Sequence, residues 1–358
     1  MRKPFASALQ PWTLVLGLTA AGIAGATEIT LPTLDVGAGL RTSFDAIKYS
    51  GGDSSKNVDD YNLDSIRLYV NGKVDDDIKF TFNTEYTGSP PSGQNTVQVM
   101  DAIGRFEFSP QVNIWAGRFL PPSDRANLYG PYYANDWSVY NDGVQDGYPS
   151  VAVGRDNGVA YWGDFGMFKF SVGNFDIPST IGNNDTLTAA RVQVDFWDPE
   201  PGYYLNGTYY GSKDILALGF AGQRVDSNKK AYSADFMLEK KVMDGGAFSL
   251  ESEYTKYDGL GGYDANYNES DGAYGLVAFL FPQKIGMGKI QLLAKYAKAN
   301  FSEGTADDYS QKTSEADVNY IIKDFNARIS LYMRHTAYSG DTAPVASTAA
   351  GVGLQLQI

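Results

Sequence analysis

The chain has 358 residues, of which 43% are apolar and 20% charged, and it contains 39 glycines, 25 tyrosines, one histidine and no cysteine. This composition excludes disulfide and thiol chemistry and argues against a disordered chain, and with one histidine we expect no metal site and no cofactor. The formal charge of −13 argues against nucleic acid as a partner, because phosphate binding needs a basic surface.

The N-terminal segment has the composition of a secretory signal peptide. Basic residues at positions 2 and 3 precede a mostly apolar stretch at 12–21, and Ala24-Gly25-Ala26 offers the small residues of a cleavage site. A membrane-anchoring helix is the alternative, which the glycines and the small-residue ending make weaker. We expect residues 1–26 to be removed on export and residues 27–358 to form one domain of net charge −15, because two positive charges leave.

Beyond this segment, apolar and polar residues alternate over about ten positions in one stretch after another. Between 325 and 333, for example, Ala327, Ile329 and Leu331 alternate with Arg328 and Ser330. A period of two puts these sets on opposite faces of a strand. Strands of about 9–11 residues suit a tilted bilayer crossing, and lipid requires the sheet to close on itself. We therefore expect an all-β fold, a transmembrane antiparallel β-barrel in the outer membrane of a Gram-negative bacterium, surrounded by lipid.

The number of strands follows from the turns. Tight turns such as 75–77 and 164–166 alternate with long loops such as 259–270 and 302–311, as periplasmic turns and outer loops do. Seventeen candidate strands start near residues 34, 61, 78, 97, 112, 155, 167, 186, 203, 214, 231, 246, 271, 288, 312, 325 and 346. The alternation slips between Trp197 and Ala231, so we expect sixteen strands and one false candidate in that region.

One connection is much longer than the others. Residues 119–154 follow the fifth candidate strand, contain several prolines and aromatic residues, and show no sustained alternation. Long ordered loops are usually functional. We therefore expect the functional residues of the chain to include those of this loop.

Local motifs surround this loop. They are Ala116-Gly117-Arg118-Phe119-Leu120-Pro121-Pro122, then Arg155-Asp156-Asn157-Gly158-Val159, Tyr161-Trp162-Gly163-Asp164-Phe165-Gly166 and Val172-Gly173-Asn174-Phe175. Together they resemble the phosphate-selective porin O/P family, over about residues 97–176. The resemblance implies a homotrimeric diffusion channel, often for anions, whose loop 119–154 folds into the barrel as a constriction. The terminal Ile358 departs from the family, in which an aromatic residue is usual.

The charges of the lumen face bear on selectivity, because phosphate selectivity needs a ladder of like positive charges. The strand faces assign these basic residues to the lumen: Arg41, Arg67, Lys73, Lys79, Arg105, Lys169, Arg191, Lys289, Lys295, Arg328 and Arg334. They assign these acidic residues: Asp35, Asp45, Glu85, Asp101, Glu107, Asp195, Asp235, Glu239, Glu251, Glu253, Glu315 and Asp317. The balance is nearly neutral, although a register slip of one residue would reverse the affected faces.

The constriction is expected to set acidic loop residues against basic wall residues. The expected pore and constriction residues are Arg118, Asp124, Arg125, Asp136, Asp142, Asp146, Arg155, Arg41, Arg67, Arg105, Arg328 and Arg334. Opposed acidic and basic walls would pass small hydrophilic solutes and ions by passive diffusion, with weak or mildly cationic selectivity. An anion- or phosphate-selective porin is the alternative.

Other interpretations remain open at this point. An outer-membrane phospholipase-like enzyme would need His335, but a lone histidine at a strand end is more often a surface residue, so we expect no enzyme. Carboxylate runs such as 75–77 are more simply solvated turns than calcium sites. The pairs Tyr203-Tyr204 and Tyr209-Tyr210 fit a membrane-interface girdle, and the tyrosines at 129, 132 and 133 fit either such a belt or an aromatic rail for sugars.

Overall fold

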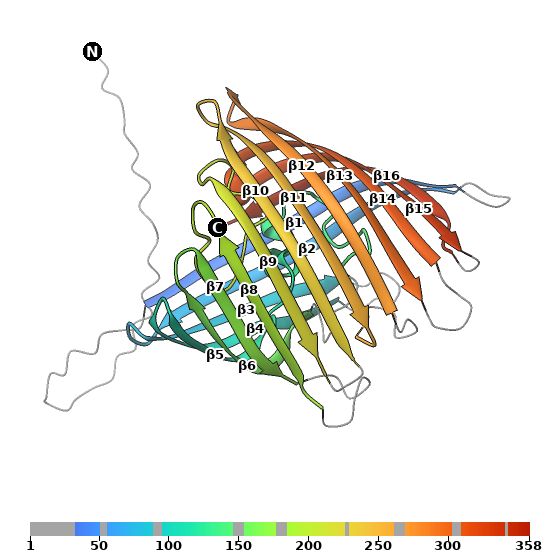
Figure 1. Ribbon diagram of the computed structural model, residues 1–358. Helices are drawn as coiled ribbons and strands as arrows, with labels where there is room; N and C mark the ends of the chain where they lie inside the picture. Colours follow the sequence, from blue (N-terminus) through green and yellow to red (C-terminus); the bar gives the residue numbers. More distant parts are fainter. Residues whose placement is uncertain are drawn as a thin grey trace, which may run out of the picture. The chain divides into compact units, whose positions relative to one another are not determined.

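A computed structural model describes residues 33–50, 56–88, 95–145, 154–176, 185–225, 229–260, 269–302, 309–340 and 343–358. Within these ranges sixteen antiparallel strands close into a barrel, in which each strand pairs with the next in sequence and β16 pairs with β1 (Figure 1). The barrel and its even strand number agree with the prediction. The expected signal peptide and Asp146 lie outside the described residues.

The strands of the first half are β1 (Thr33–Ser50), β2 (Asn57–Lys73), β3 (Ile78–Gly88), β4 (Asn95–Ser109), β5 (Val112–Phe119), β6 (Asp156–Asp164), β7 (Phe168–Phe175) and β8 (Leu187–Asp195). Those of the second half are β9 (Ile215–Arg224), β10 (Lys230–Val242), β11 (Gly246–Asp258), β12 (Glu269–Ile285), β13 (Gly288–Ser302), β14 (Tyr309–Lys323), β15 (Ala327–Gly340) and β16 (Ala346–Gln357). The described residues also form two short helices, α1 (Arg125–Tyr133) and η2 (Asp324–Asn326). No helix in the described ranges has the length and apolar character that a membrane crossing needs.

The false strand candidate is the one near residue 203. Sixteen of the seventeen expected starts lie within four residues of an observed strand, whereas residues 196–214 form an irregular connection between β8 and β9. Pro199 and Pro201 lack the N–H that a strand ladder uses, which favours an irregular chain here. The connection follows an even-numbered strand, as do the tight turns after β2, β4 and β6, so it lies at the same end of the barrel as these turns.

The two faces of the wall differ as the alternation requires. On β13, Gln291 and Lys295 point inward and are buried, whereas Leu292 and Tyr296 point outward and are exposed. Apolar side chains on the outer face suit lipid, and polar ones on the inner face suit a hydrated lumen. Many charged side chains on the inner face are buried, because segments of the chain enter the barrel and pack against them.

The strands differ in length around the wall. The strands β5 to β8 have 8, 9, 8 and 9 residues, whereas β12, β13 and β14 have 17, 15 and 15. The connection after β5 begins among these short strands, so the chain turns into the lumen about halfway along its longer neighbour β4.

Candidate functional site

Two glycines that face each other across β5 and β6 lie where the chain turns into the lumen. Gly117 on β5 and Gly158 on β6 are cross-strand partners. Gly117 has a positive φ of 130°, and a Cβ there would overlap the carbonyl oxygen of Ala102. A Cβ on Gly158 would overlap the ring of Phe175. With these side chains absent, Phe119 packs against Phe175 at 5.0 Å between ring centroids and starts the inward turn.

The segment that follows, residues 120–145, lies inside the barrel and is mostly buried. Asp124 begins α1 as its N-cap, with its Oδ1 accepting the N–H of Asn127 at 2.8 Å. The helix is kinked where Gly130, with φ of 65°, precedes Pro131. We call residues 120–145 the inward segment.

A lysine on the wall holds two carboxylates of the inward segment. The Nζ of Lys295 lies 3.0 Å from Asp136 and 2.7 Å from Asp142, and all three side chains are at most 3% exposed. Two acidic residues of β14 add to this contact, because Asp317 and Glu315 accept the backbone N–H groups of residues 137 and 138. The inward segment is therefore fixed to β13 and β14 by buried charges.

Two arginines hold the backbone of the same stretch instead of its carboxylates. Arg328 on β15 donates to the carbonyl oxygens of Ala134, Asn135 and Asp136 at 2.9, 3.1 and 3.3 Å. Arg41 on β1 donates to the carbonyl of Trp137 at 2.9 Å and lies 4.1 Å from its ring centroid. Two of the acidic residues expected to face these arginines across an opening, Asp136 and Asp142, instead contact Lys295, so both arginines act as anchors of the backbone.

The one basic residue of the inward segment forms the link to a second piece of chain. Arg125, fully buried, makes a two-pronged ion pair with Glu200 of the β8–β9 connection and lies 3.5 Å from Asp235 on β10. Burial alone would lower the pKa of Arg125 and raise that of Glu200, but their mutual attraction dominates. The pKa of Glu200 is therefore held below its ordinary value, and that of Arg125 well above.

The β8–β9 connection, residues 196–214, also folds into the lumen. Tyr203 is buried, donates its hydroxyl to the carbonyl of Leu120 at 2.7 Å, and lies 4.8 Å from Trp115 between ring centroids. Tyr210 is buried near Phe325, at 5.0 Å between ring centroids. The prediction of a membrane-interface girdle for these tyrosines is wrong, because the connection carries them inward. The sequence signal for this was the break in turn-length alternation.

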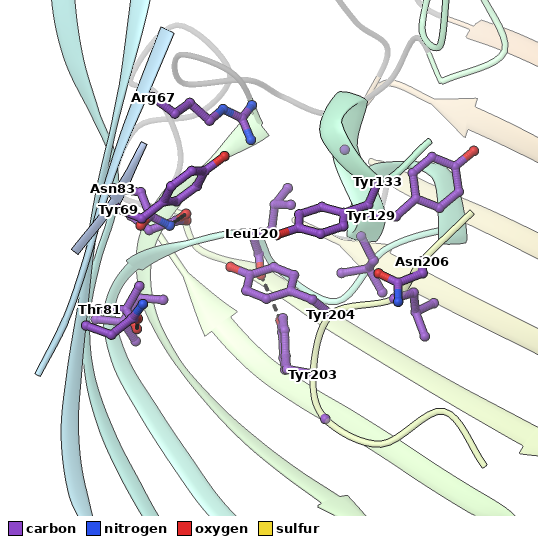
Figure 2. Close-up of a pocket in the computed structure, with 18 of the residues that line it drawn as sticks. Arg67, Tyr69, Thr81, Asn83, Leu120, Tyr129, Tyr133, Tyr203, Tyr204 and Asn206 are labelled. Atoms are coloured by element: carbon purple, nitrogen blue, oxygen red, sulfur yellow. Dashed lines mark hydrogen bonds between the residues drawn. The ribbon is translucent and has the colours of Figure 1, made fainter. Parts of the chain in front are cut away.

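A cavity of about 1020 Å³ lies beside the wall formed by β1 to β6. Figure 2 shows Tyr129, Tyr133, Tyr203 and Tyr204 on the side of the inward segment and the β8–β9 connection, with Arg67, Tyr69, Thr81 and Asn83 on the barrel wall. The charged lining residues are Arg67, Arg105, Arg155, Asp35, Asp101, Glu107 and Asp324. This cavity is the candidate functional site.

Every arginine of the cavity has a carboxylate partner on the wall. The N–O distances are 2.5 Å for Arg67 and Glu85, 2.8 Å for Arg105 and Glu107, and 3.3 Å for Arg155 and Asp101. Paired charges of opposite sign leave little net field, so the lining does not form the ladder of like charges that strong selectivity needs.

The remaining expected site residues lie elsewhere. Arg118, at the end of β5, is half-buried and donates to the carbonyl of Val99 at 3.0 Å. Arg334 faces Glu315 across β14 and β15 and is half-buried. Of the expected residues, the structure thus brings Arg67, Arg105 and Arg155 to the cavity. The others for which it describes contacts anchor the inward segment, cap its helix or lie on the wall.

His335, the basis of the enzyme alternative, is exposed on β15. Its Nδ1 lies 2.9 Å from the hydroxyl of Thr348 on β16. A threonine partner in this place gives no support to a serine–histidine hydrolase.

The fold is found among solved outer-membrane proteins. The channel DcaP of Acinetobacter baumannii matches with a TM-score of 0.61 at 12% identity, over 94% of this chain and 100% of that one. OmpT of Vibrio cholerae matches with 0.57 at 14%, over 91% and 98%. An anion-selective porin from Comamonas acidovorans matches with 0.55 at 13%, over 91% and 100%. At such identities the likeness is one of fold. No family model and no curated protein matches the chain.

Proposed function

We propose that the chain is an outer-membrane porin through which small hydrophilic solutes and ions diffuse passively with weak selectivity. The observation that carries this proposal is the cavity of about 1020 Å³ inside a closed barrel, bounded by the inward segment and lined by paired charges. Solved outer-membrane channels and porins of the same fold support it, as does the apolar outer face of the wall. The inward segment would act as the constriction loop of residues 119–154.

Reversal potentials test the selectivity. Because each cavity arginine faces a carboxylate, we expect single channels in a KCl gradient to reverse close to zero, with any shift toward cation preference. Strong anion preference, combined with block of the chloride current by low phosphate concentrations, would contradict this expectation and favour the anion-selective alternative. A chain that forms no channels in planar bilayers would refute the porin proposal itself.

Kinship with the phosphate-selective O/P porins is part of the proposal. Its support is that the motif residues Gly117, Phe119 and Gly158 carry the inward turn of the chain. Selectivity need not follow kinship, since the lining rather than the turn sets the field in the pore. The leader of residues 1–26 completes the proposal, and the N-terminal sequence of the exported protein should begin at Thr27.

We also propose a homotrimer. A rise of about 3.3 Å per residue and a tilt of about 45° give the 8- or 9-residue strands β5 to β8 a height of roughly 20 Å, below the apolar band of about 25 Å. A second copy covering this wall would remove the mismatch, and OmpT of Vibrio cholerae is described in a trimer form. Small residues at 349–351 could allow close contact between barrels, but they add little support, because Ala349 is buried and only Ala350 is exposed. The native mass in detergent should correspond to three chains, and a mass of one chain would refute the trimer.

A further inference from the structure

The cavity has two chemically different walls. On one side, Tyr133 of α1 and Tyr204 of the β8–β9 connection are half-buried and line the cavity (Figure 2). The ring of Tyr133 rests on Phe325 at 5.1 Å, and that of Tyr204 on Trp115 at 5.8 Å. Both rings therefore pack against a second aromatic ring of the cavity lining and keep part of their surface toward the cavity.

The opposite wall carries hydrogen-bonding groups of both kinds. Arg105 donates to the hydroxyl of Thr81 at 3.0 Å, which in turn donates to the side-chain oxygen of Asn71 at 2.8 Å. Asn83 donates to Asp101 at 2.8 Å, and its buried side-chain oxygen has no hydrogen-bond partner among the described residues. Donors and acceptors thus lie together on β2, β3 and β4, across the cavity from the tyrosines.

Charge decides which class of solute suits this pair of walls. An anion would meet arginines whose charge is already balanced by Glu85, Glu107 and Asp101 at 2.5–3.3 Å. Displacing a carboxylate partner would leave it buried and uncompensated, which is costly. A neutral molecule with many hydroxyl groups needs no displacement, because each hydroxyl both donates and accepts.

We infer that the cavity is a binding site for neutral polyhydroxylated rings, that is, for sugars, which pass through the proposed channel. The apolar C–H face of a sugar ring would lie on Tyr133 and Tyr204, while its hydroxyl edge would reach the Arg105–Thr81–Asn71 and Asn83–Asp101 groups. The inference rests on the proposed porin function and specifies its solute.

Single-channel current in KCl, with sucrose added to one side, tests the inference. We expect brief interruptions of the current whose frequency rises with sucrose concentration and whose effect saturates, because a site is being filled. Polyethylene glycol of similar size, which has no ring face, should lower the current without saturation. Sucrose that behaves like the polymer in a conducting channel would overturn the inference and leave the porin proposal intact.

Variants of the two tyrosines separate stacking from simple obstruction. The double substitution Tyr133→Leu and Tyr204→Leu should weaken sucrose binding about tenfold, because a leucine keeps apolar volume but offers no ring face. The matched pair Tyr133→Phe and Tyr204→Phe keeps the rings and should bind sucrose nearly as the natural chain does. Tyr232→Leu with Tyr254→Leu, on the exposed outer face, serves as a control.

Two outcomes would contradict the inference at the level of the site. Equal sucrose block in the leucine pair and the natural chain would show that the tyrosines do not bind the solute. Block by phosphate or benzoate at lower concentrations than sucrose would show that the arginines serve as an anion site. Absence of any channel current would instead refute the proposed function.

Discussion

Replacing Lys295 with methionine should release the inward segment and raise the single-channel conductance. The substitution leaves Asp136 and Asp142 buried without the ammonium group that lies 3.0 and 2.7 Å from them. Removing one partner of a buried ion pair costs about 3–5 kcal/mol, so we expect a lower unfolding midpoint in detergent and a shift of the reversal potential toward cations. Conductance, unfolding midpoint and reversal potential are all measured on the same purified protein.

The controls for this variant separate burial from charge. Lys240→Met removes the same charge from an ion pair with Asp214 whose lysine is 49% exposed, and it should change stability by less than about 1 kcal/mol. Adding Asp136→Asn and Asp142→Asn to Lys295→Met removes the uncompensated charges and should restore much of the lost stability. Conductance and unfolding of Lys295→Met that equal those of the natural chain would show that the segment is held by other contacts.

Replacing Arg125 with methionine should separate the two pieces of chain that fill the lumen. Glu200 and Asp235 would then be buried with one cationic partner fewer. We expect the free energy of unfolding at neutral pH to fall by about 3–5 kcal/mol. We also expect larger and noisier single-channel currents, because Arg125 joins the inward segment to the β8–β9 connection. Arg105→Met, whose ion pair lies at the open cavity, should cost less.

Acid should reduce the difference in stability between the natural chain and the Arg125→Met variant. The pKa of Glu200 is lowered in the fold, so its stabilisation is fully present above the ordinary glutamate value of 4.5 and is lost as pH falls through the lowered pKa. In the variant, protonation of Glu200 instead relieves an uncompensated charge. Unfolding midpoints measured from pH 7 downward should therefore converge, and a constant gap would mean that Glu200 is not the partner that matters.

The barrel could be predicted from the sequence because a two-residue period is a local property. Leu292 and Lys295, for example, are assigned to opposite faces by counting alone. The inward path of residues 120–145 was expected only through the motif around Gly117 and Gly158, whose requirement for glycine is visible once the strands are paired.

The contacts between residues of the site could not be predicted from the two-residue period. Lys295 and Asp136 are 159 positions apart, and only the closed barrel brings them together. The connection 196–214 gave the false strand candidate for a different reason, because its tyrosine pairs have a high strand propensity although they do not alternate with polar residues. Pro199 and Pro201 were the contrary signal, together with the slip in turn lengths.

The inward segment crosses the seam at which the barrel closes, and this has a consequence for the order of folding. Its residues 132–137 are held by Arg41 on β1, Gln355 on β16 and Arg328 on β15. That set of donors exists in one place only after the first and last strands have paired, since nearly the whole chain separates them. Contacts of such long range form late because the entropy of closing the chain opposes them. Docking of the segment would then be a final kinetic step, which follows closure of the barrel and stabilises the closed form.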